Sequence, residues 1–297
     1  PAPRALLRAP REPRARRAHL RQDLQGHGEG EMSKAPIVSV VIPTLNGART
    51  IDSLLRALED QIWRPNEIIV VDSSSTDSTV GLALSHKLVH VISIERSDFN
   101  HGATRNMAFN QAHGDFVFFL TQDALPSSNT YISNLMEPFH NENIALAYGR
   151  QIARPDAKRY VQLVQEFNYP DKALVKNKND VDRLGIKAYF CSDVCSAYRR
   201  ESLEDVGGIP SPCSTNEDML AAARLIQQGY SVAYVPSASV IHSHNFTPLE
   251  QYKRNKEIGL FLHNHAEELS LPSEVGEGKK LAKTVLQRLI KESRYAE

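Results

Sequence analysis

The sequence predicts an α/β protein with a mixed, mostly parallel central sheet that is flanked by helices. Runs of β-branched and aromatic residues recur at 37–43, 67–72 and 114–120, without a helical period. Segments with apolar residues at helical spacing lie between these runs, as at Ile51, Leu54, Leu55 and Leu58. Because a strand, helix, strand order forms a right-handed parallel unit, the alternation predicts a parallel sheet.

The first half of the chain is expected to alternate strictly, as strand 37–43, helix 50–61, strand 67–72, helix 79–86, strand 89–94, a helix ending near 112 and strand 114–120. An acid follows the second strand, at Asp72, and another follows the fourth, at Asp123. Parallel strands end at one edge of a sheet, and ligands bind outside that edge. We therefore expect Asp72 and Asp123 on one ligand-binding rim.

The second half changes character. It is expected to hold strand 144–149, helix 160–167, short strands or strand ends at 188–192 and 197–200, helices 201–208 and 219–228, and edge strands at 231–236 and 238–241. From 248 onward, and again over 278–294, apolar stripes run beside basic residues. Such helices lie on an anionic membrane surface, or they pack on the domain or on a second copy of the chain as a homodimer.

Composition excludes some classes of protein. The 297 residues carry a formal net charge of +0, which argues against nucleic acid as a partner. Three cysteines leave one unpaired in any disulfide scheme, which favours a reducing, cytoplasmic location. No run of about 18 apolar residues is present, so any membrane contact is expected to be peripheral.

The organisation is expected to comprise three parts. Residues 1–34 are rich in Arg, Pro and Ala and lack a hydrophobic period, which predicts a disordered N-terminal extension. Met32 precedes the first strand closely, so we expect the natural start there. Residues 35–247 are expected to form the catalytic domain, and 248–297 a helical C-terminal segment.

Five motifs in order resemble the inverting family-2 glycosyltransferases of GT-A fold: Val38–Asn46, Ile69–Thr79, Gly102–Asn106, Leu120–Asp123 and Asn216–Asp218. The variants Phe99–Gly102, Thr121–Ala124 and His242–Asn245 resemble the bacterial rhamnosyltransferases of O-antigen and surface polysaccharide synthesis. The resemblance implies an inverting transfer of L-rhamnose from dTDP-β-L-rhamnose, giving an α-rhamnoside. It also implies an acceptor glycan on a polyprenyl diphosphate, at the inner face of the cytoplasmic membrane.

The resemblance implies roles for particular residues. The nucleotide-sugar would contact Pro43, Thr44, Asn46, Asp72, Ser74, Arg105, Gln122 and Asp123, with Arg105 on the diphosphate because its planar fork suits phosphate oxygens. Mg²⁺ or Mn²⁺ would be held by Asp123, where many relatives carry a second acid in place of Thr121. His242 or His244 would add a ligand, and alternation along an extended chain predicts that only one of them does.

Inversion requires a base that accepts the proton of the acceptor hydroxyl. The family position is the Asp of Glu-Asp, so Asp218 is expected as the base with Glu217 orienting, although the two roles can be exchanged. The ordinary explanation of these acids is capping of the helix that follows.

Three alternatives stay open. A family-2 transferase with a UDP-hexose or UDP-GlcNAc donor has the same motifs. A nucleotidyltransferase has a similar sheet, but it normally carries a glycine-rich loop where Thr44–Ala48 has one glycine. A degenerate nucleotide-sugar-binding protein would explain the missing first acid at Thr121.

Overall fold

The computed structural model describes residues 35–270 and 276–292, and the described residues from Pro36 onward belong to one compact unit. The predicted extension at 1–34, with the start at Met32, lies outside the described residues. Four parallel strands open the unit: β1 (Val38–Thr44), β2 (Glu67–Asp72), β3 (Val89–Ser93) and β4 (Phe116–Leu120). Their spatial order is β3-β2-β1-β4, so the carboxyl ends of all four meet at one edge, as predicted.

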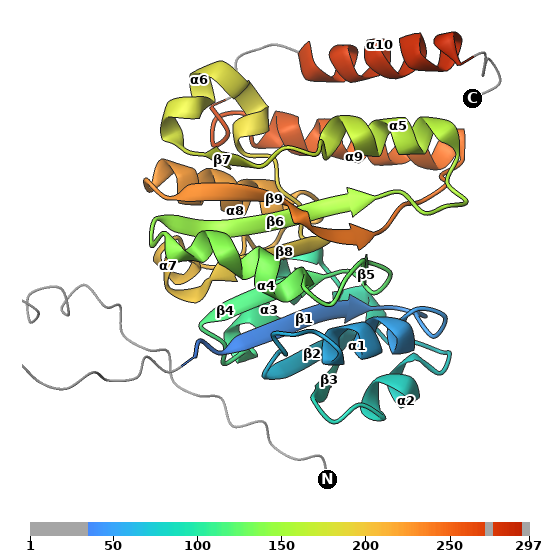
Figure 1. Ribbon diagram of the computed structural model, residues 1–297, viewed down its shortest axis with the longest axis vertical. Coiled ribbons are helices and arrows are strands. Elements are labelled where there is room, and N and C mark those ends of the chain that lie inside the picture. The colour runs from blue at the N-terminus through green and yellow to red at the C-terminus, as the bar shows by residue number, and fades with distance from the viewer. Residues whose placement is uncertain (1–34, 271–275, 293–297) are drawn as a thin grey trace, which may run out of the picture. The chain divides into compact units, whose positions relative to one another are not determined.

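Helices cover both faces of this parallel part (Figure 1). They are α1 (Ile51–Glu59), α2 (Thr79–Leu84) and α3 (His101–Gln111). Alternation along β1 explains the two layers: Val40 and Ile42 pack with α1 and α2, whereas Val41 packs with α3. The predicted apolar stripe of α1 is buried at Ile51, Leu54, Leu55 and Leu58.

The second half extends the sheet in mixed directions. Its strands are β5 (Leu125–Pro126), β6 (Ile144–Ile152), β7 (Leu174–Lys176), β8 (Cys195–Arg199) and β9 (Ser231–Ile241). β8 runs antiparallel between β4 and β6, and β6 pairs in parallel with β9. The nine described strands therefore form one mixed sheet.

Two strand predictions were wrong. The segments 231–236 and 238–241 are one strand, β9, and it is not an edge strand, because β6 pairs on one side and β5 and β7 on the other. A register shift after Gly149 leaves 236–238 as a bulge, which accommodates Pro236. A Cβ on Gly149 would lie 2.1 Å from the Ala238 carbonyl oxygen, so this close approach requires glycine.

The segment 188–192 is not a strand either. It follows a 3₁₀ turn and contributes the buried residues Tyr189 and Cys191 to the core. The carbonyl oxygens of Lys187 and Phe190 accept hydrogen bonds from the buried ammonium of Lys176 and not from a neighbouring strand. A short apolar run does not show whether a segment is a strand or irregular, because buried segments of both kinds have a similar composition.

The remaining helices are α4 (Tyr131–Met136), α5 (Arg159–Asn168), α6 (Val181–Leu184), α7 (Arg200–Asp205), α8 (Glu217–Gln227), α9 (Pro248–Asn264) and α10 (Gly276–Lys291), with 3₁₀ turns at Arg96–Asp98, Glu137–His140, Lys178–Asp180 and Gly185–Ala188. α9 begins with a capping box between Thr247 and Glu250. α10 lies beside α5 through the ion pairs Arg159–Glu292 and Arg288–Glu166.

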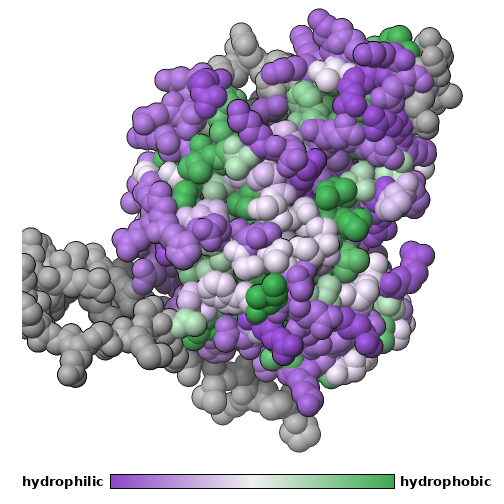
Figure 2. Space-filling view, viewed as in Figure 1, coloured by the Kyte–Doolittle hydropathy of each residue, from purple (hydrophilic) through white to green (hydrophobic). Residues whose placement is uncertain are grey.

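The surface and the helices bear on membrane contact. On the face seen in Figure 2, hydrophobic side chains form small groups among hydrophilic ones, the pattern typical of a water-facing surface. Within the described ranges, no helix combines the length and the apolar character that crossing a bilayer demands.

Candidate active site

The first part of the site is built where β1 and β2 end. Thr44 pairs with Asp72 in the strand register, and its hydroxyl donates to Asp72 Oδ1 over 3.0 Å. Ser75 donates to the same carboxylate twice, from its hydroxyl to Oδ1 over 2.5 Å and from its backbone N–H to Oδ2 over 2.8 Å. Asp72 is buried, and its hydrogen bonds to Ser75 fix the loop that follows β2.

Two loops are joined at this edge. Asn46 and Ser74 both have positive φ, at 49° and 59°. The Asn46 backbone N–H donates to the Ser75 hydroxyl, and its side-chain oxygen accepts from the backbone N–H of Thr76 over 2.9 Å. The hydroxyl of Ser74 donates to the Ile94 carbonyl oxygen. The loops after β1 and β2 are therefore held as one unit beside the half-buried Pro43.

Gln122 connects this unit to the end of β4. Its side-chain oxygen accepts from Leu45 N over 2.9 Å, and its side-chain nitrogen donates to Leu45 O over 3.1 Å. Both amide groups are occupied by the backbone. Gln122 therefore positions the loop after β1, and because it also lines a pocket its nucleotide contact stays a prediction.

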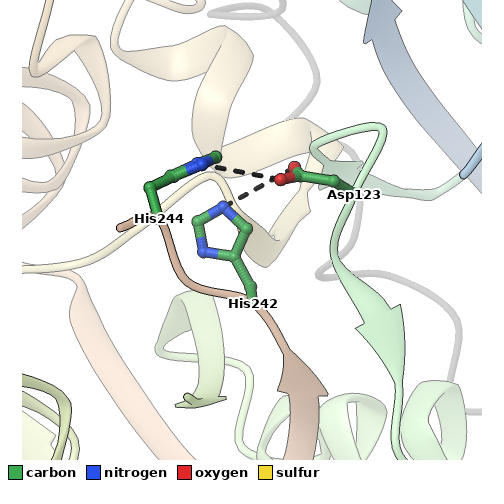
Figure 3. A group of neighbouring side chains, drawn as sticks. All are labelled: Asp123, His242 and His244. Carbon is green, nitrogen blue, oxygen red and sulfur yellow. Dashed lines mark ion pairs between the residues drawn. The ribbon is translucent and has the colours of Figure 1, made fainter. Parts of the chain in front are cut away.

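Asp123 follows in the turn between β4 and β5, and it faces two histidines that lie just beyond β9 (Figure 3). Asp123 Oδ1 lies 3.6 Å from His242 Nε2, and Oδ2 lies 3.7 Å from His244 Nε2. One ligand atom from each of the three lies within 4.8 Å of the others. Donor atoms that share an ion at about 2.1 Å lie about 3 to 4 Å apart, so a divalent cation fits among them.

The expectation that only one histidine faces Asp123 was wrong. The prediction misapplied strand alternation: in an extended chain, residues two apart, such as 242 and 244, lie on the same face. β9 ends at Ile241, and the next residues have no regular structure. Both imidazoles turn toward the carboxylate, with ring centroids 4.8 Å apart.

His242 is buried and has a fixed partner on its other ring nitrogen. Its Nδ1 lies 2.9 Å from Gln151 Oε1. The amide nitrogen of Gln151 donates to the Tyr169 hydroxyl over 2.6 Å and to the Ser192 hydroxyl over 2.9 Å. In this arrangement Nδ1 carries the proton and Nε2 presents a lone pair toward Asp123. Burial lowers the pKa of His242 to about 4, so the ring stays neutral.

A pocket of about 340 Å³ opens beside Asp123. Gln122, Asp123 and Arg154 are among its lining residues. The volume is that of a small-molecule site. Side chains of negative and of positive charge therefore line a cavity at the edge where the parallel strands end.

Buried charges form a second cluster, between α3 and α8. Arg105 Nη1 lies 2.9 Å from Glu217 Oε1, and Arg105 Nε lies 3.7 Å from Asp193 Oδ2. The Arg105 residue is only 4% exposed. Burial raises the pKa of Asp193 to about 6, although the positive charge of Arg105 opposes the shift.

Asp218 belongs to this cluster but is only partly buried. Its Oδ2 accepts from the Asp193 backbone N–H over 3.1 Å, and its Oδ1 accepts from Met219 N over 2.8 Å. Burial, followed by the negative charges of Glu217 and Asp193, raises the pKa of Asp218 to about 8. A carboxyl with such a pKa is matched to proton transfer near neutral pH.

The loop before α8 brings Arg105 and Glu217 together. Asn100 caps α3 and also accepts from Cys213 N over 2.9 Å. Gly102 donates to the Cys213 carbonyl oxygen over 2.8 Å, and a Cβ on Gly102 would lie 2.0 Å from the Pro210 carbonyl oxygen. The Gly102–Asn106 motif therefore serves close packing of α3 against this loop.

Comparison with known proteins decides the family. The profile of Glycosyl transferase family 2 matches residues 39–207, more than half of the chain. The chain belongs to this family. It is 38% identical over 263 residues to the O-antigen chain rhamnosyltransferase RfbN of Salmonella typhimurium, covering 87% of this chain and 83% of that one. It is also 38% identical to the O-antigen chain rhamnosyltransferase WbaN of Salmonella anatum, over 88% and 83% of the two chains.

Solved structures agree on the fold of this glycosyltransferase, which is GT-A. A mannosyltransferase from Pyrobaculum calidifontis, in complex with GDP-Man and Mn²⁺, superposes with a TM-score of 0.57 at 19% identity, over 84% of this chain and 68% of that one. Glucosyl-3-phosphoglycerate synthase from Mycobacterium tuberculosis, with Mn²⁺ and UDP, gives 0.55 at 21% identity over 81% and 82%. Family membership sets aside the nucleotidyltransferase alternative.

The predicted residues of the family-2 glycosyltransferase fall into one connected set. Asp72 and Thr44 connect through Leu45 to Gln122, which precedes Asp123. From Asp123 the contacts continue through His242 and Gln151 to Ser192. The next residue, Asp193, donates its backbone N–H to Asp218. The three predicted acids Asp72, Asp123 and Asp218 thus belong to one chain of contacts across the sheet edge.

One predicted role does not suit its position. Arg105 was expected on the diphosphate, yet its guanidinium is buried between Glu217 and Asp193. Three residues of the site were missed: Gln151, Arg154 and Asp193. The Gly-Arg-Gln sequence that ends β6 and the Ser-Asp before β8 were the available signals. Gln151 lies near the end of β6 and Asp193 just before β8, so both polar side chains lie at the ligand-binding edge of this glycosyltransferase.

Proposed function

We propose that this family-2 glycosyltransferase transfers L-rhamnose from dTDP-β-L-rhamnose, with inversion, to a hydroxyl of a lipid-linked glycan. One observation carries the proposal: the 38% identity to O-antigen chain rhamnosyltransferases extends over 87% of this chain and 83% of the relative. Similarity over that length extends across both the parallel half and the mixed half of the sheet. The product would be an α-rhamnoside of a surface polysaccharide.

The nucleotide would bind over the loops that follow β1 and β2. Asp72 supports this assignment by holding Thr44 and Ser75, which leaves backbone groups of these loops for the base and ribose. The Asn46 and Ser74 side chains bond within the loops, so they too would act mainly by shaping the binding surface, beside Pro43. Gln122 would position the same surface from the other side.

The cofactor would be Mn²⁺ in preference to Mg²⁺, because two imidazoles accompany one carboxylate at the cation-fitting group. Asp123, His242 and His244 would hold the ion. When bound there, a divalent cation supplies positive charge that stabilises a departing diphosphate. The two histidines offset the loss of the acid that many relatives carry at position 121.

Asp218 would act as the base. The acceptor hydroxyl oxygen forms a bond to C1 of rhamnose, its proton passes to the Asp218 carboxylate, and the bond from C1 to the diphosphate oxygen breaks, releasing dTDP. Glu217 is ion-paired to Arg105 at 2.9 Å and buried, which favours an orienting role and leaves Asp218 as the proton acceptor. The raised pKa of Asp218 suits this role.

The acceptor would be a glycan on a polyprenyl diphosphate at the inner face of the cytoplasmic membrane. The helix α9 supports peripheral contact there, since Leu249, Tyr252 and Leu260 are exposed beside Lys253 and Lys256. A homodimer through the same helices is the alternative. All three cysteines are buried and unpaired, as a reducing cytoplasm favours. The domain boundaries at 35–247 and 248–297 stay a prediction.

A donor panel tests the proposal. The protein, with Mn²⁺, is titrated calorimetrically with dTDP-rhamnose, UDP-glucose, UDP-GlcNAc and GDP-mannose, and donor hydrolysis is measured in parallel. We expect the tightest binding and the fastest hydrolysis with dTDP-rhamnose. Tighter binding of a UDP-sugar would replace the donor assignment, whereas binding without any metal-dependent hydrolysis would favour a degenerate nucleotide-sugar-binding protein.

A further inference from the structure

Arg154 lies at the metal group although no motif pointed to it. It follows β6 two residues after the strand ends at Ile152. Its backbone N–H donates to the Ser243 hydroxyl over 3.0 Å, which ties it to the segment between the two histidines. Its guanidinium Nη2 lies 3.7 Å from Asp123 Oδ2, and it lines the 340 Å³ pocket with that carboxylate.

The guanidinium of Arg154 is free to bind a ligand, in contrast to that of Arg105. The Arg154 side chain is 37% exposed, whereas that of Arg105 is 5% exposed and ion-paired at 2.9 Å. Among the described residues Arg154 has one ion-pair partner, Asp123, at a distance too long for a hydrogen bond. Several N–H donors of Arg154 therefore stay available in the pocket.

The charges at this site match a diphosphate. Asp123 contributes one negative charge and Arg154 one positive charge, and metal-bound imidazoles are neutral. Asp156 also lines the pocket, but it is exposed, so water and salt screen its charge. A divalent cation raises the sum to two positive charges, which balances the two negative charges of the diphosphate in a nucleotide-sugar. Without Arg154, one negative charge of the diphosphate would remain without a positive partner in this group.

We propose that Arg154 binds the diphosphate of the nucleotide-sugar donor, in the role that the sequence assigned to Arg105. The inference rests on the proposed function, because it needs a nucleoside-diphosphate donor at the Asp123 group. The bidentate N–H fork of Arg154 donates to phosphate oxygens and stabilises the charge that develops as the sugar leaves. The negative charge of Asp123, 3.7 Å away, attracts the fork toward the pocket before the donor arrives.

Binding of a diphosphate and of a bare nucleoside separates this role from a structural one. With Mn²⁺ present, Arg154→Ala should weaken dTDP binding about tenfold to a hundredfold, as loss of a charged hydrogen-bond donor predicts. Thymidine binding should stay unchanged. Arg154→Lys should fall between, because it keeps the charge and loses the fork. Arg150→Ala is the matched control, since Arg150 lies in β6 four residues before Arg154 and pairs with the exposed Asp171.

Metal binding without nucleotide gives a second readout, of opposite sign. Removing a positive charge 3.7 Å from Asp123 should tighten binding of Mn²⁺ alone to Arg154→Ala, measured by electron paramagnetic resonance. The same variant should retain Mn²⁺ less well than wild type once dTDP is added. These opposite effects on Mn²⁺ binding, without and with dTDP, are not expected if Arg154 merely supports the fold.

The outcomes are distinct. If wild type binds dTDP with Mn²⁺ and Arg154→Ala binds it equally well, the role of Arg154 is wrong and the proposed function stands. Equal losses of thymidine and dTDP affinity would also overturn it, because they indicate a general disturbance. If wild type binds no nucleoside diphosphate at all, the proposed function itself fails.

Discussion

His242 Nδ1 and Gln151 Oε1 lie 2.9 Å apart, and this contact joins the two halves of the site. On one side of it, His242 Nε2 faces Asp123. On the other, Gln151 bonds Ser192, whose neighbour Asp193 donates to Asp218. A single amide side chain thus connects the residues expected to hold the metal with the residue expected to take the proton.

Gln151 should control metal affinity. Gln151→Leu removes the acceptor that orients His242, and loss of such a partner typically costs about tenfold to a hundredfold in metal affinity. Gln151→Glu supplies a carboxylate acceptor to the same N–H, so it should keep Mn²⁺ affinity near that of wild type. Mn²⁺ titration by electron paramagnetic resonance measures both variants. Gln162→Leu is the control, because that amide bonds Ala157 and Arg159 and not His242.

The pH dependence of turnover should follow Asp218. Its pKa is raised to about 8, so kcat/KM should rise about tenfold per pH unit below pH 8 and level off above it, because only the carboxylate accepts a proton. Asp193→Asn removes a negative charge that raises this pKa, and the acidic limb should move to lower pH. If the acidic limb of the pH profile does not move in Asp193→Asn, the group that titrates is not Asp218.

Asp218 should also reduce stability at high pH. A carboxyl whose folded pKa lies near 8, above an unfolded value of 3.8, disfavours folding increasingly as pH rises between those values. Asp218→Asn should therefore raise the free energy of unfolding at pH 8, by on the order of 5 kcal/mol if the whole shift is relieved. The difference should vanish near pH 4. Chemical denaturation of both proteins at several pH values checks the sign, and a constant difference would contradict it.

Packing of α3 should depend on the absence of a side chain at Gly102. A Cβ there would lie 2.0 Å from the Pro210 carbonyl oxygen, so Gly102→Ala must displace α3 or the loop before α8. We expect a loss of about 1 to 3 kcal/mol in unfolding free energy, the usual cost of overpacking. Gly81→Ala in α2 meets nothing within 4 Å and is the matched control. An equal melting temperature for the two variants would show that the loop adapts freely.

The sequence predicted the parallel half well because its signals are local. The buried runs ending at Thr44 and Asp72 carry β-branched residues, and the stripe of α1 has a clear helical period. These patterns fix which strand ends share an edge. Asp72 and Asp123 could therefore be placed on one rim without coordinates.

What the sequence missed depends on contacts between distant segments. His242 and His244 can share a face because they are two residues apart, but no local pattern shows that the segment after β9 lies beside Asp123. Arg105 is enclosed by Glu217 and Asp193, 112 and 88 positions away along the chain. No local pattern distinguishes an arginine buried among acids from one that faces a pocket, as Arg154 does.

The central claim, that Asp123 and Asp218 serve one donor site in different roles, is tested most directly by comparing two variants. Affinity for dTDP-rhamnose with Mn²⁺ and turnover are measured for Asp123→Asn and Asp218→Asn. We predict that Asp123→Asn loses metal-dependent donor binding, while Asp218→Asn binds donor like wild type and turns over about 10² to 10⁴ times more slowly. Loss of donor binding in Asp218→Asn, or turnover close to wild type, would contradict the account.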